Sequence, residues 1–502
     1  MDPAGLVERG YGFWRISIMK KSLLASITGF LPGIVLMFSV QTSHAGSATW
    51  KANPISGDWN TAANWTPMTV PNAPTDTATF AASNQTTVSN SAAVEVDSVV
   101  FDAGASAFTI MPARAFPFYI EGVGITNNSG IVQNFVATVD AFGGSQMAFT
   151  NSAKAGSLNV FTNNGAIVGG QDGGVIYFYD SSSADNATFI NNGAAFSDSS
   201  GGATLFNGSL AGGSTAGNAV LIANGSEFSD FDDRSAGQIS FELGSHGGTA
   251  RVEVFGNGHV NVTNHRLTIG SLEGDGKVRA RNFLSVGSNN LSTTFSGVIQ
   301  DYAGFSTACL LTKIGTGKLV LAHANAYTGG TIVKRGKLVV NNFRDSGTGS
   351  GPVQVEHGTL GGKGIIAGAV TIGTGSGIGA VLSPGYVHGS GRAGSLTINS
   401  ALTFNSDGRY EAQVNSSTSM ADEVAALGVS INASAQFALS DIGNGTLPLG
   451  TTFTMINNTS ADPIAGTFSN LADNSTFTIN GNTYQASYEG GDGNDLTLTV
   501  VP

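Results

Sequence analysis

Short apolar runs that each follow a glycine recur at a nearly constant interval in the second half of the chain. Two copies of Gly-Lys-Leu, at residues 317–319 and 336–338, open aliphatic runs typical of β-strands. The glycines that mark the interval are 21, 20, 19 and 22 residues apart: Gly276, Gly297, Gly317, Gly336 and Gly358. A period near twenty, built of short strands, predicts coils stacked as a solenoid.

A looser repeat lies between residues 149 and 260. Its strand-like runs end in Asn-Gly or a related pair, and their closing glycines are 28, 32 and 31 residues apart. Asn and Gly accept positive φ, so they suit a corner at the end of each strand. Periods near thirty predict that each unit is one coil plus a loop that leaves the stack. Stacked coils place equivalent residues about 4.8 Å apart, so we expect the corner asparagines to form a ladder along the axis. These conditions predict a β-helix.

The region 46–135 carries three tryptophans, Trp50, Trp59 and Trp65, followed by strand-like runs. A solenoid needs a terminal cap because its first coil would otherwise expose its core and its strand edges. The three bulky aromatic residues suit that role. The alternative is an aromatic platform that binds glycans by stacking on sugar rings.

Composition narrows the classes of function. The 502 residues include 70 glycines, only 11% are charged, and 22 Lys and Arg face 34 Asp and Glu, a net charge of −12. This balance argues against nucleic acid or an anionic membrane as a partner, because both select clustered Lys and Arg. Cys309 is the one cysteine, so it forms no internal disulfide, and its apolar neighbours predict a buried structural thiol.

The first 45 residues read as an N-terminal extension followed by a secretory signal peptide. Met19-Lys20-Lys21 precedes an apolar stretch over 23–40, and Ser43-His44-Ala45 has the small-x-small form of a cleavage site. We therefore expect cleavage after Ala45, with the true start at Met1 or Met19. Pro32 disfavours the alternative, a transmembrane anchor. No second apolar run of spanning length follows, so the mature chain is not expected to be an integral membrane protein.

Residues 310–342 resemble the autotransporter-associated β-strand repeat, also called the passenger-associated transport repeat. The resemblance rests on a pattern of spaced Leu, Gly and Val residues with Lys313 and Asn-x-Tyr-x-Gly-Gly-Thr at 325–331. The matching positions are Leu311, Lys313, Gly315, Gly317, Leu319, Leu321, Asn325, Tyr327, Gly329, Gly330, Thr331, Gly336, Leu338 and Val340.

The resemblance implies an all-β fold, a right-handed parallel β-helix, in an exported and surface-displayed passenger. It supplies no catalytic residue, metal ligand or cofactor. We expect a cap over 46–135, the β-helix over 136–405, and an antiparallel β region over 406–502 that closes the far end. Such passengers end in a membrane β-barrel, for which the chain has no room before Pro502. We therefore expect either a truncated C-terminus or a released protein.

Three stretches carry candidate chemistry. Gly490–Asp495 matches the first six positions of a calcium-binding nonapeptide repeat, but a single copy supplies half a site, so an acidic turn is expected. The glycine-rich run 371–379 lacks the Gly-Lys-Ser/Thr of a phosphate loop. The densest acidic stretch is Asp230, Asp232 and Asp233 beside Arg234, which we expect to be a solvated loop.

The histidines, including His246, His259 and His265, have no metal-ligand spacing. We therefore predict a non-enzymatic structural or surface protein that acts in adhesion, surface display or an extracellular matrix. Surface glycans or other components of the cell surface or matrix are the expected partners. The alternative is a polysaccharide-active β-helix enzyme, which needs carboxylates and a basic residue to converge over neighbouring coils.

Overall fold

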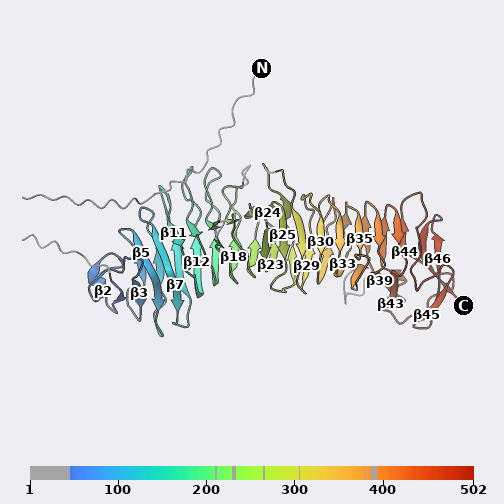
Figure 1. The fold of residues 1–502 in the computed structure, drawn as a ribbon, viewed down its shortest axis with the longest axis horizontal. Coiled ribbons are helices and arrows are strands. Elements are labelled where there is room, and N and C mark those ends of the chain that lie inside the picture. The colour runs from blue at the N-terminus through green and yellow to red at the C-terminus, as the bar shows by residue number, and fades with distance from the viewer. Residues whose placement is uncertain are drawn as a thin grey trace, which may run out of the picture. The chain divides into compact units, whose positions relative to one another are not determined.

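The computed structural model describes residues 46–502, apart from 210–211, 229–232, 243, 264–265, 305, 378 and 386–392. The predicted signal peptide, at 1–45, lies outside these residues. Short parallel strands follow one another as a stack of coils (Figure 1). Within the part described, the only helix is a 3-10 turn at Ala62–Asn64. The prediction of a parallel β-helix is therefore confirmed, and its right-handedness stays a prediction.

Two long sheets form the first two sides of the β-helix. Sheet 1 has twelve strands, parallel except for the terminal pair β1 and β2. In spatial order they are β2 (Trp65–Thr66), β1 (Ala48–Trp50), β3 (Thr77–Phe80), β5 (Val94–Phe101), β7 (Phe118–Asn127), β11 (Gln146–Phe149), β13 (Val175–Phe178), β15 (Ala203–Phe206), β19 (Gln238–Phe241), β21 (His259–Val262), β24 (Lys277–Ala280) and β27 (Val298–Asp301).

Sheet 2 has sixteen strands and extends along most of the stack. Its strands are β4 (Thr87–Ser89), β6 (Thr109–Met111), β8 (Gln133–Ala137), β12 (Ser157–Asn163), β14 (Asn186–Asn191), β18 (Val220–Ala223), β20 (Arg251–Val254), β23 (Ser271–Gly274), β26 (Thr293–Phe295), β29 (Lys318–Leu321), β31 (Lys337–Val340), β33 (Gly358–Gly362), β36 (Ala380–Pro384), β39 (Gly408–Asn415) and β40 (Met420–Ala421), with β43 (Gln436–Asp441) paired to β39.

The third side changes character along the axis. In the first half it consists of single-residue bridges that link Gly124, Lys154, Ser183, Thr215 and His246 in turn. From residue 266 onward a full sheet takes over. Sheet 3 contains β22 (Arg266–Ile269), β25 (Phe283–Val286), β28 (Leu310–Lys313), β30 (Thr331–Val333), β32 (Val353–Val355), β35 (Val370–Ile372), β38 (Leu402–Phe404) and β42 (Val429–Ile431).

The C-terminal part contains sheet 4, which is partly antiparallel. Its strands are β34 (Ile365–Ile366), β37 (Ser395–Ile398), β41 (Glu423–Ala426), β44 (Thr452–Asn458), β47 (Asp495–Val501), β46 (Asn482–Gly490) and β45 (Thr476–Ile479). Parallel pairing continues to β44, and only the pairs among β44, β47, β46 and β45 are antiparallel. The prediction of antiparallel structure over 406–502 was therefore placed too early, because the coils continue past residue 406.

Aromatic rings fill the interior of the first half. Phe149, Phe178, Phe206 and Phe241 form a column inside sheet 1, with successive ring centroids 4.8, 4.9 and 5.0 Å apart. A second column, inside sheet 2, consists of Phe135, Phe161 and Phe189 at 4.8 and 4.6 Å. These distances match the spacing of parallel strands, because equivalent residues of successive coils lie above one another.

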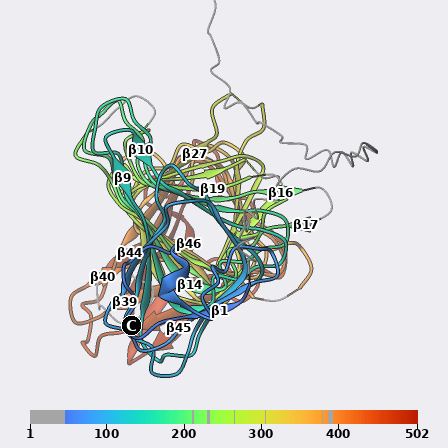
Figure 2. The ribbon, with the colours of Figure 1, turned by 90° about the vertical axis from the view of Figure 1, so that its left-hand side faces the viewer.

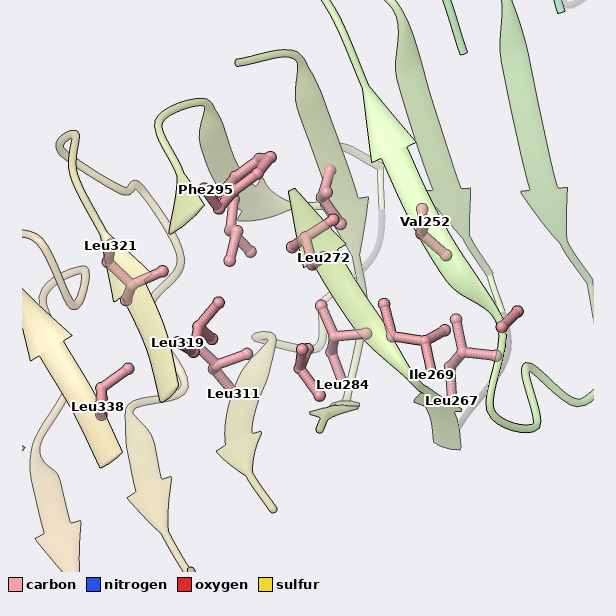
Figure 3. Packing of buried hydrophobic residues seen from close by; sticks show 14 of the residues in the cluster. Val252, Leu267, Ile269, Leu272, Leu284, Phe295, Leu311, Leu319, Leu321 and Leu338 are labelled. Carbon is pink, nitrogen blue, oxygen red and sulfur yellow. The ribbon is translucent and has the colours of Figure 1, made fainter. Parts of the chain in front are cut away.

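Aliphatic side chains replace these rings in the second half. Leu284 and Leu311 from sheet 3 point toward Leu319 and Phe295 from sheet 2 (Figure 3). Three sheets now contribute inward side chains, so smaller residues fill the same interior. The alternation of buried and outward positions follows from the two-residue period of a strand.

The glycine interval proves to belong to two sides of the β-helix. Gly276 and Gly297 precede β24 and β27 in sheet 1, whereas Gly317, Gly336 and Gly358 precede or open strands of sheet 2. The interval from Gly297 to Gly317 is therefore not one coil. In sheet 2 that coil, from Phe295 to its partner Leu321, has 26 residues, because residues 302–309 form an extra loop. The prediction that these five glycines mark one ladder of equivalent positions is therefore wrong. Between glycines that precede or open strands of the same sheet, the interval does correspond to one coil.

The predicted asparagine ladder is present at the corner after β12, β14 and β18. The Asn192 side-chain amide donates to Asn164 Oδ1 at 3.2 Å, and the Asn224 amide donates to Asn192 Oδ1 at 3.0 Å. A buried rung lies beside it, where Asn163 Nδ2 donates to Asn191 Oδ1 at 2.8 Å. Each coil is thus held to the next by side chains as well as by strands.

The tryptophans form the N-terminal cap. Trp50, Trp59 and Trp65 are buried, and the rings of Trp50 and Trp59 each lie 5.0 Å from that of Trp65, edge to face. They pack on Phe80 of the first coil. Because the ring faces are covered, the alternative of an exposed glycan platform at these tryptophans is wrong.

Candidate functional site

The outer face of sheet 1 gathers the densest set of aromatic and charged side chains outside the core. Outward positions on successive strands align in register. Glu95 is the cross-strand partner of Tyr119. Further along the sheet, one row of aligned positions contains Tyr177, Ser240, Asn261 and Arg279. Projections that carry the short hairpins β9 (Val139–Asp140) to β10 (Gly143–Gly144) and β16 (Gly208–Ser209) to β17 (Gly212–Gly213) lie on either side of this face (Figure 2).

Three tyrosines form a patch on this face. The rings of Tyr177 and Tyr179 stack with centroids 5.5 Å apart and planes 13° from parallel. Tyr119, on β7, is 37% exposed and lies in the same row of positions as Tyr177, with Ala148 of β11 between the two. Burial, followed by the neighbouring tyrosines, raises the pKa of Tyr179 to about 12. The Tyr179 hydroxyl therefore stays protonated at neutral pH and can both donate and accept hydrogen bonds.

Carboxyl groups lie next to the tyrosine patch. Burial, together with the charge of Glu95 and a hydrogen bond with its side chain, raises the pKa of Glu121 from 4.5 to about 7. Burial also raises the pKa of Glu242. With a pKa near neutral, the Glu121 carboxyl exists in both protonated and ionised forms at neutral pH and can donate or accept a hydrogen bond.

The acidic stretch at 230–234 behaves differently from the prediction of a solvated loop. Asp233 is buried, and both of its carboxylate oxygens lie 2.8 Å from Lys277 Nζ. Arg279 donates to the same carboxylate. Asp233 thus clamps its loop onto the outer face of sheet 1 through two cations. Asp230 and Asp232 lie outside the described residues. Arg234 turns away and pairs with Asp172 at 3.1 Å.

A polar side chain is buried near this clamp. Asn261 precedes Arg279 in the row of outward positions, is 7% exposed, and no described donor reaches its Oδ1. Sequence reasoning missed Lys277 and Arg279 because they lie 44 and 46 residues beyond Asp233. The usable signal was the alternation of basic residues at 277, 279 and 281, which a β-strand directs to one face.

The other candidates prove to be structural. Gly490–Asp495 forms the turn between β46 and β47, and Asp495 Oδ1 accepts the Asn458 N–H at 2.8 Å. In the run 371–379, the Thr374 and Gly375 N–H groups donate to the Asp407 carboxylate at 3.0 and 2.7 Å. Cys309 is buried as predicted, and burial raises its pKa to about 12.

The histidines do not converge. His246 is exposed, His259 is buried, and His265 lies outside the described residues. Among the residues with described positions, no group of three or more His, Cys, Asp or Glu could hold a metal ion. That same part of the chain contains no helix with the length and apolarity needed to cross a membrane.

Three polar residues of the segment 311–340, Lys313, Asn325 and Tyr327, are buried, and the first two bond across successive coils. Lys313 is buried, and its ammonium donates to the carbonyls of Gly315 at 3.0 Å and Arg335 at 3.2 Å, as well as to that of Ile314. Asn325 accepts the Ile299 N–H and donates to the Gly347 carbonyl, both at 2.7 Å, and so joins three coils.

Tyr327 and Gly336 have equally structural roles in this segment. Tyr327 is fully buried, and its hydroxyl lies 2.7 Å from Thr331 Oγ1. Gly336 has a φ of 70°, and a Cβ there would lie 2.5 Å from the carbonyl oxygens of Gly315 and Gly317. Only glycine fits this position without displacing the coil below it.

Comparison with known proteins identifies this segment. Residues 311–340 match the family model described as the passenger-associated-transport-repeat. This repeat indicates an exported, surface-associated protein of the autotransporter-passenger type. No curated protein gives a significant match to the chain. The residues that match the family are therefore those that hold coils together, whereas the outer face of sheet 1 lies outside the matched segment.

Proposed function

We propose that the protein is an exported passenger-type protein that works by adhesion, and that the outer face of sheet 1 binds glycans of a cell surface or extracellular matrix. The observation that carries this proposal is the tyrosine patch, with stacked Tyr177 and Tyr179 beside the exposed ring of Tyr119. Aromatic rings on a flat sheet offer apolar faces to sugar rings, and their hydroxyls remain available for hydrogen bonds.

The groups around the patch support binding of a polar, uncharged ligand. Glu121 and Glu95 share a hydrogen bond, and Asn207 makes one with Tyr179. Ligand sites typically combine an apolar surface with a few placed polar groups that fix orientation. Sugar hydroxyls are both donors and acceptors, so they suit protonated and ionised carboxyl groups equally.

We further propose that this face is not catalytic. Glycoside hydrolysis needs two carboxyl groups about 5–9.5 Å apart so that they flank the scissile bond. Glu95 and Glu121 are in direct hydrogen-bond contact, which is too close for that arrangement. Asp233, the acid that the sequence singled out, is buried and neutralised by Lys277 and Arg279. The polysaccharide-active alternative predicts release of reducing ends or unsaturated products from a polysaccharide, which a product assay measures directly.

The binding proposal is tested with an array of neutral oligosaccharides, followed by calorimetric titration of those that bind. Tyr119→Ala combined with Tyr177→Ala is expected to weaken binding at least tenfold. Phe343→Ala is the matched control, because it removes a 71% exposed aromatic ring outside sheet 1. The proposal is wrong if the double variant binds as the unaltered protein does, or if no oligosaccharide binds.

A further inference from the structure

A shallow trough of about 400 Å³ lies on the outer face of sheet 2, over strands that include β29 and β31. Leu319 and Leu321 point into the core, and Val320 between them faces outward (Figure 3). Val320 and Val339 are 9% and 5% exposed and form its apolar floor. The remaining lining residues are Thr294, Lys318, Ala322, Asn341 and Lys363.

The trough is basic although the protein is acidic. Residues 311–363 contain seven Lys or Arg and only two carboxylates, whereas the whole chain has a net charge of −12. The basic residues are Lys313, Lys318, Lys334, Arg335, Lys337, Arg344 and Lys363. Charges more than about 8 Å away are largely screened at physiological salt, so an anion in the trough senses the local excess of positive charge.

Two of these lysines form an unfavourable pair. Lys318 and Lys337 are direct cross-strand partners, and like charges in that position destabilise a sheet. Neither forms an ion pair with any carboxylate that the structure describes. Glu411, whose charge acts on Lys337, is itself paired with Arg409 at 3.3 Å. A bound anion would relieve this repulsion, and local conflicts of this kind concentrate at functional sites.

We propose that this trough binds an anionic polysaccharide. The carboxylate or sulfate groups of the polymer would lie near Lys318 and Lys363, which line the trough, and near Lys337, the cross-strand partner of Lys318, on three successive coils. The apolar face of a sugar ring would rest on Val320 and Val339, and the side chains of Thr294 and Asn341 offer a hydroxyl and an amide. Three coils extend about 10 Å along the axis, so the ligand lies along the stack.

The trough is distinct from the tyrosine patch, which lies on another sheet and is proposed for uncharged glycans. Failure of one proposal therefore leaves the other intact.

An anionic lipid surface would satisfy the same charges. The narrow apolar floor between charged rims favours a single polymer chain over a flat membrane, and we commit to the polysaccharide.

The test measures binding of polygalacturonate to the protein at about 20 mM and 150 mM salt, with neutral dextran as a comparison polymer. We expect saturable binding of polygalacturonate that weakens with salt, whereas any binding of dextran, at the tyrosine patch, is unaffected by salt and by changes in the trough. Lys318→Glu is expected to reduce the affinity at least tenfold. The same substitution leaves the melting temperature unchanged or raises it, because a Glu–Lys pair replaces the Lys–Lys pair.

Lys334→Glu is the matched control, because it changes the charge equally in the same coil but lies in the corner between β30 and β31, off the trough. Its affinity should stay within twofold of the unaltered protein. Absence of saturable binding at low salt, or equal loss in both variants, overturns the proposal. Binding of phosphatidylglycerol vesicles that depends on Lys318, without binding of polygalacturonate, overturns it in favour of a membrane surface.

Discussion

The two halves of the β-helix enclose their interior differently. Before residue 266, two sheets carry columns of phenylalanine, and the third side has single-residue bridges lined by small side chains such as Ala153, Ala184 and Ala216. Beyond it, three sheets contribute Leu, Ile and Val. Large rings on two sides and small residues on the third fill the same space as medium residues on all three, because interiors are close-packed.

The halves also differ in what their loops do. Coils of the first half have about thirty residues, and the surplus leaves the stack in projections that border the outer face of sheet 1 (Figure 2). Coils of the repeat segment have about twenty residues and bury a few polar side chains, such as Lys313 and Asn325, that bond neighbouring coils. The comparison indicates that the short, aliphatic coils provide regular structure, whereas the long, aromatic coils carry loops that can hold residues for ligand recognition.

The largest expected effect concerns the aromatic columns. Phe178→Ala should lower the free energy of unfolding by about 4–5 kcal/mol, because strand spacing fixes its neighbours and the cavity cannot collapse. Leu311→Ala, in the three-sided half, should cost about 3 kcal/mol. Chemical denaturation of both variants measures the difference. A smaller loss for Phe178→Ala would contradict the distinction between the two interiors.

A pH effect of about 2–4 kcal/mol is expected from the C-terminal coils. Burial raises the pKa of Asp422 from 3.8 to about 7, although the Gly394 and Gln413 N–H groups donate to it. The folded state therefore retains a proton that the unfolded state has released, and the free energy of unfolding falls as the pH rises from 4 to 7. Denaturation at a series of pH values measures this slope, and Asp422→Asn should flatten it.

Replacing the buried lysine of the repeat should have a smaller effect. Lys313→Met removes an ammonium that donates to three carbonyls, and should cost about 1–3 kcal/mol. Lys318→Met, at an exposed position, should stay within about 0.5 kcal/mol. Burial also lowers the pKa of Lys313 to about 8. The protein should therefore gain stability between pH 8 and 10.5, and Lys313→Met should lack that gain.

The smallest expected effects test the asparagine ladder. Asn191→Ala leaves the Asn163 amide and the Thr204 hydroxyl without their shared acceptor, and should cost about 1–2 kcal/mol. Asn192→Ala affects the half-buried outer ladder, where water can replace the lost partner, and should cost less than about 1 kcal/mol. Thermal denaturation measures both variants. Equal losses of stability in Asn191→Ala and Asn192→Ala would show that the buried and outer rungs do not differ as described.

The repetitive parts of the fold were the most predictable from the sequence. The coil period, the corner asparagines and the buried tryptophans each follow from local patterns that a single chain displays. The change of side between Gly297 and Gly317 could not be predicted, because a loop of residues 302–309 adds length without altering the glycine spacing. The spacing between two residues in the sequence gives the length of chain that joins them. It does not give the side of the β-helix on which the second residue lies.

The candidate site was harder to predict for a related reason. Asp233 was singled out by its acidic neighbours, yet the two partners that fix its role both lie on β24, two strands beyond β19 in sheet 1. The tyrosine patch likewise unites Tyr119 and Tyr177 from separate coils. Stacking brings such residues together once per coil, so functional groups assemble across repeats rather than within a contiguous motif.

The stacking of coils also has a mechanical consequence. Strand hydrogen bonds run along the axis. A pull between the two ends therefore loads all the hydrogen bonds between two neighbouring coils together, and the coils detach one after another. A coil of about twenty residues lengthens by about 70 Å when it is detached and extended, and one of thirty by about 100 Å. Single-molecule stretching should therefore show two step sizes, the longer from the aromatic half. A single cooperative rupture would contradict this picture of a protein that detaches one coil at a time.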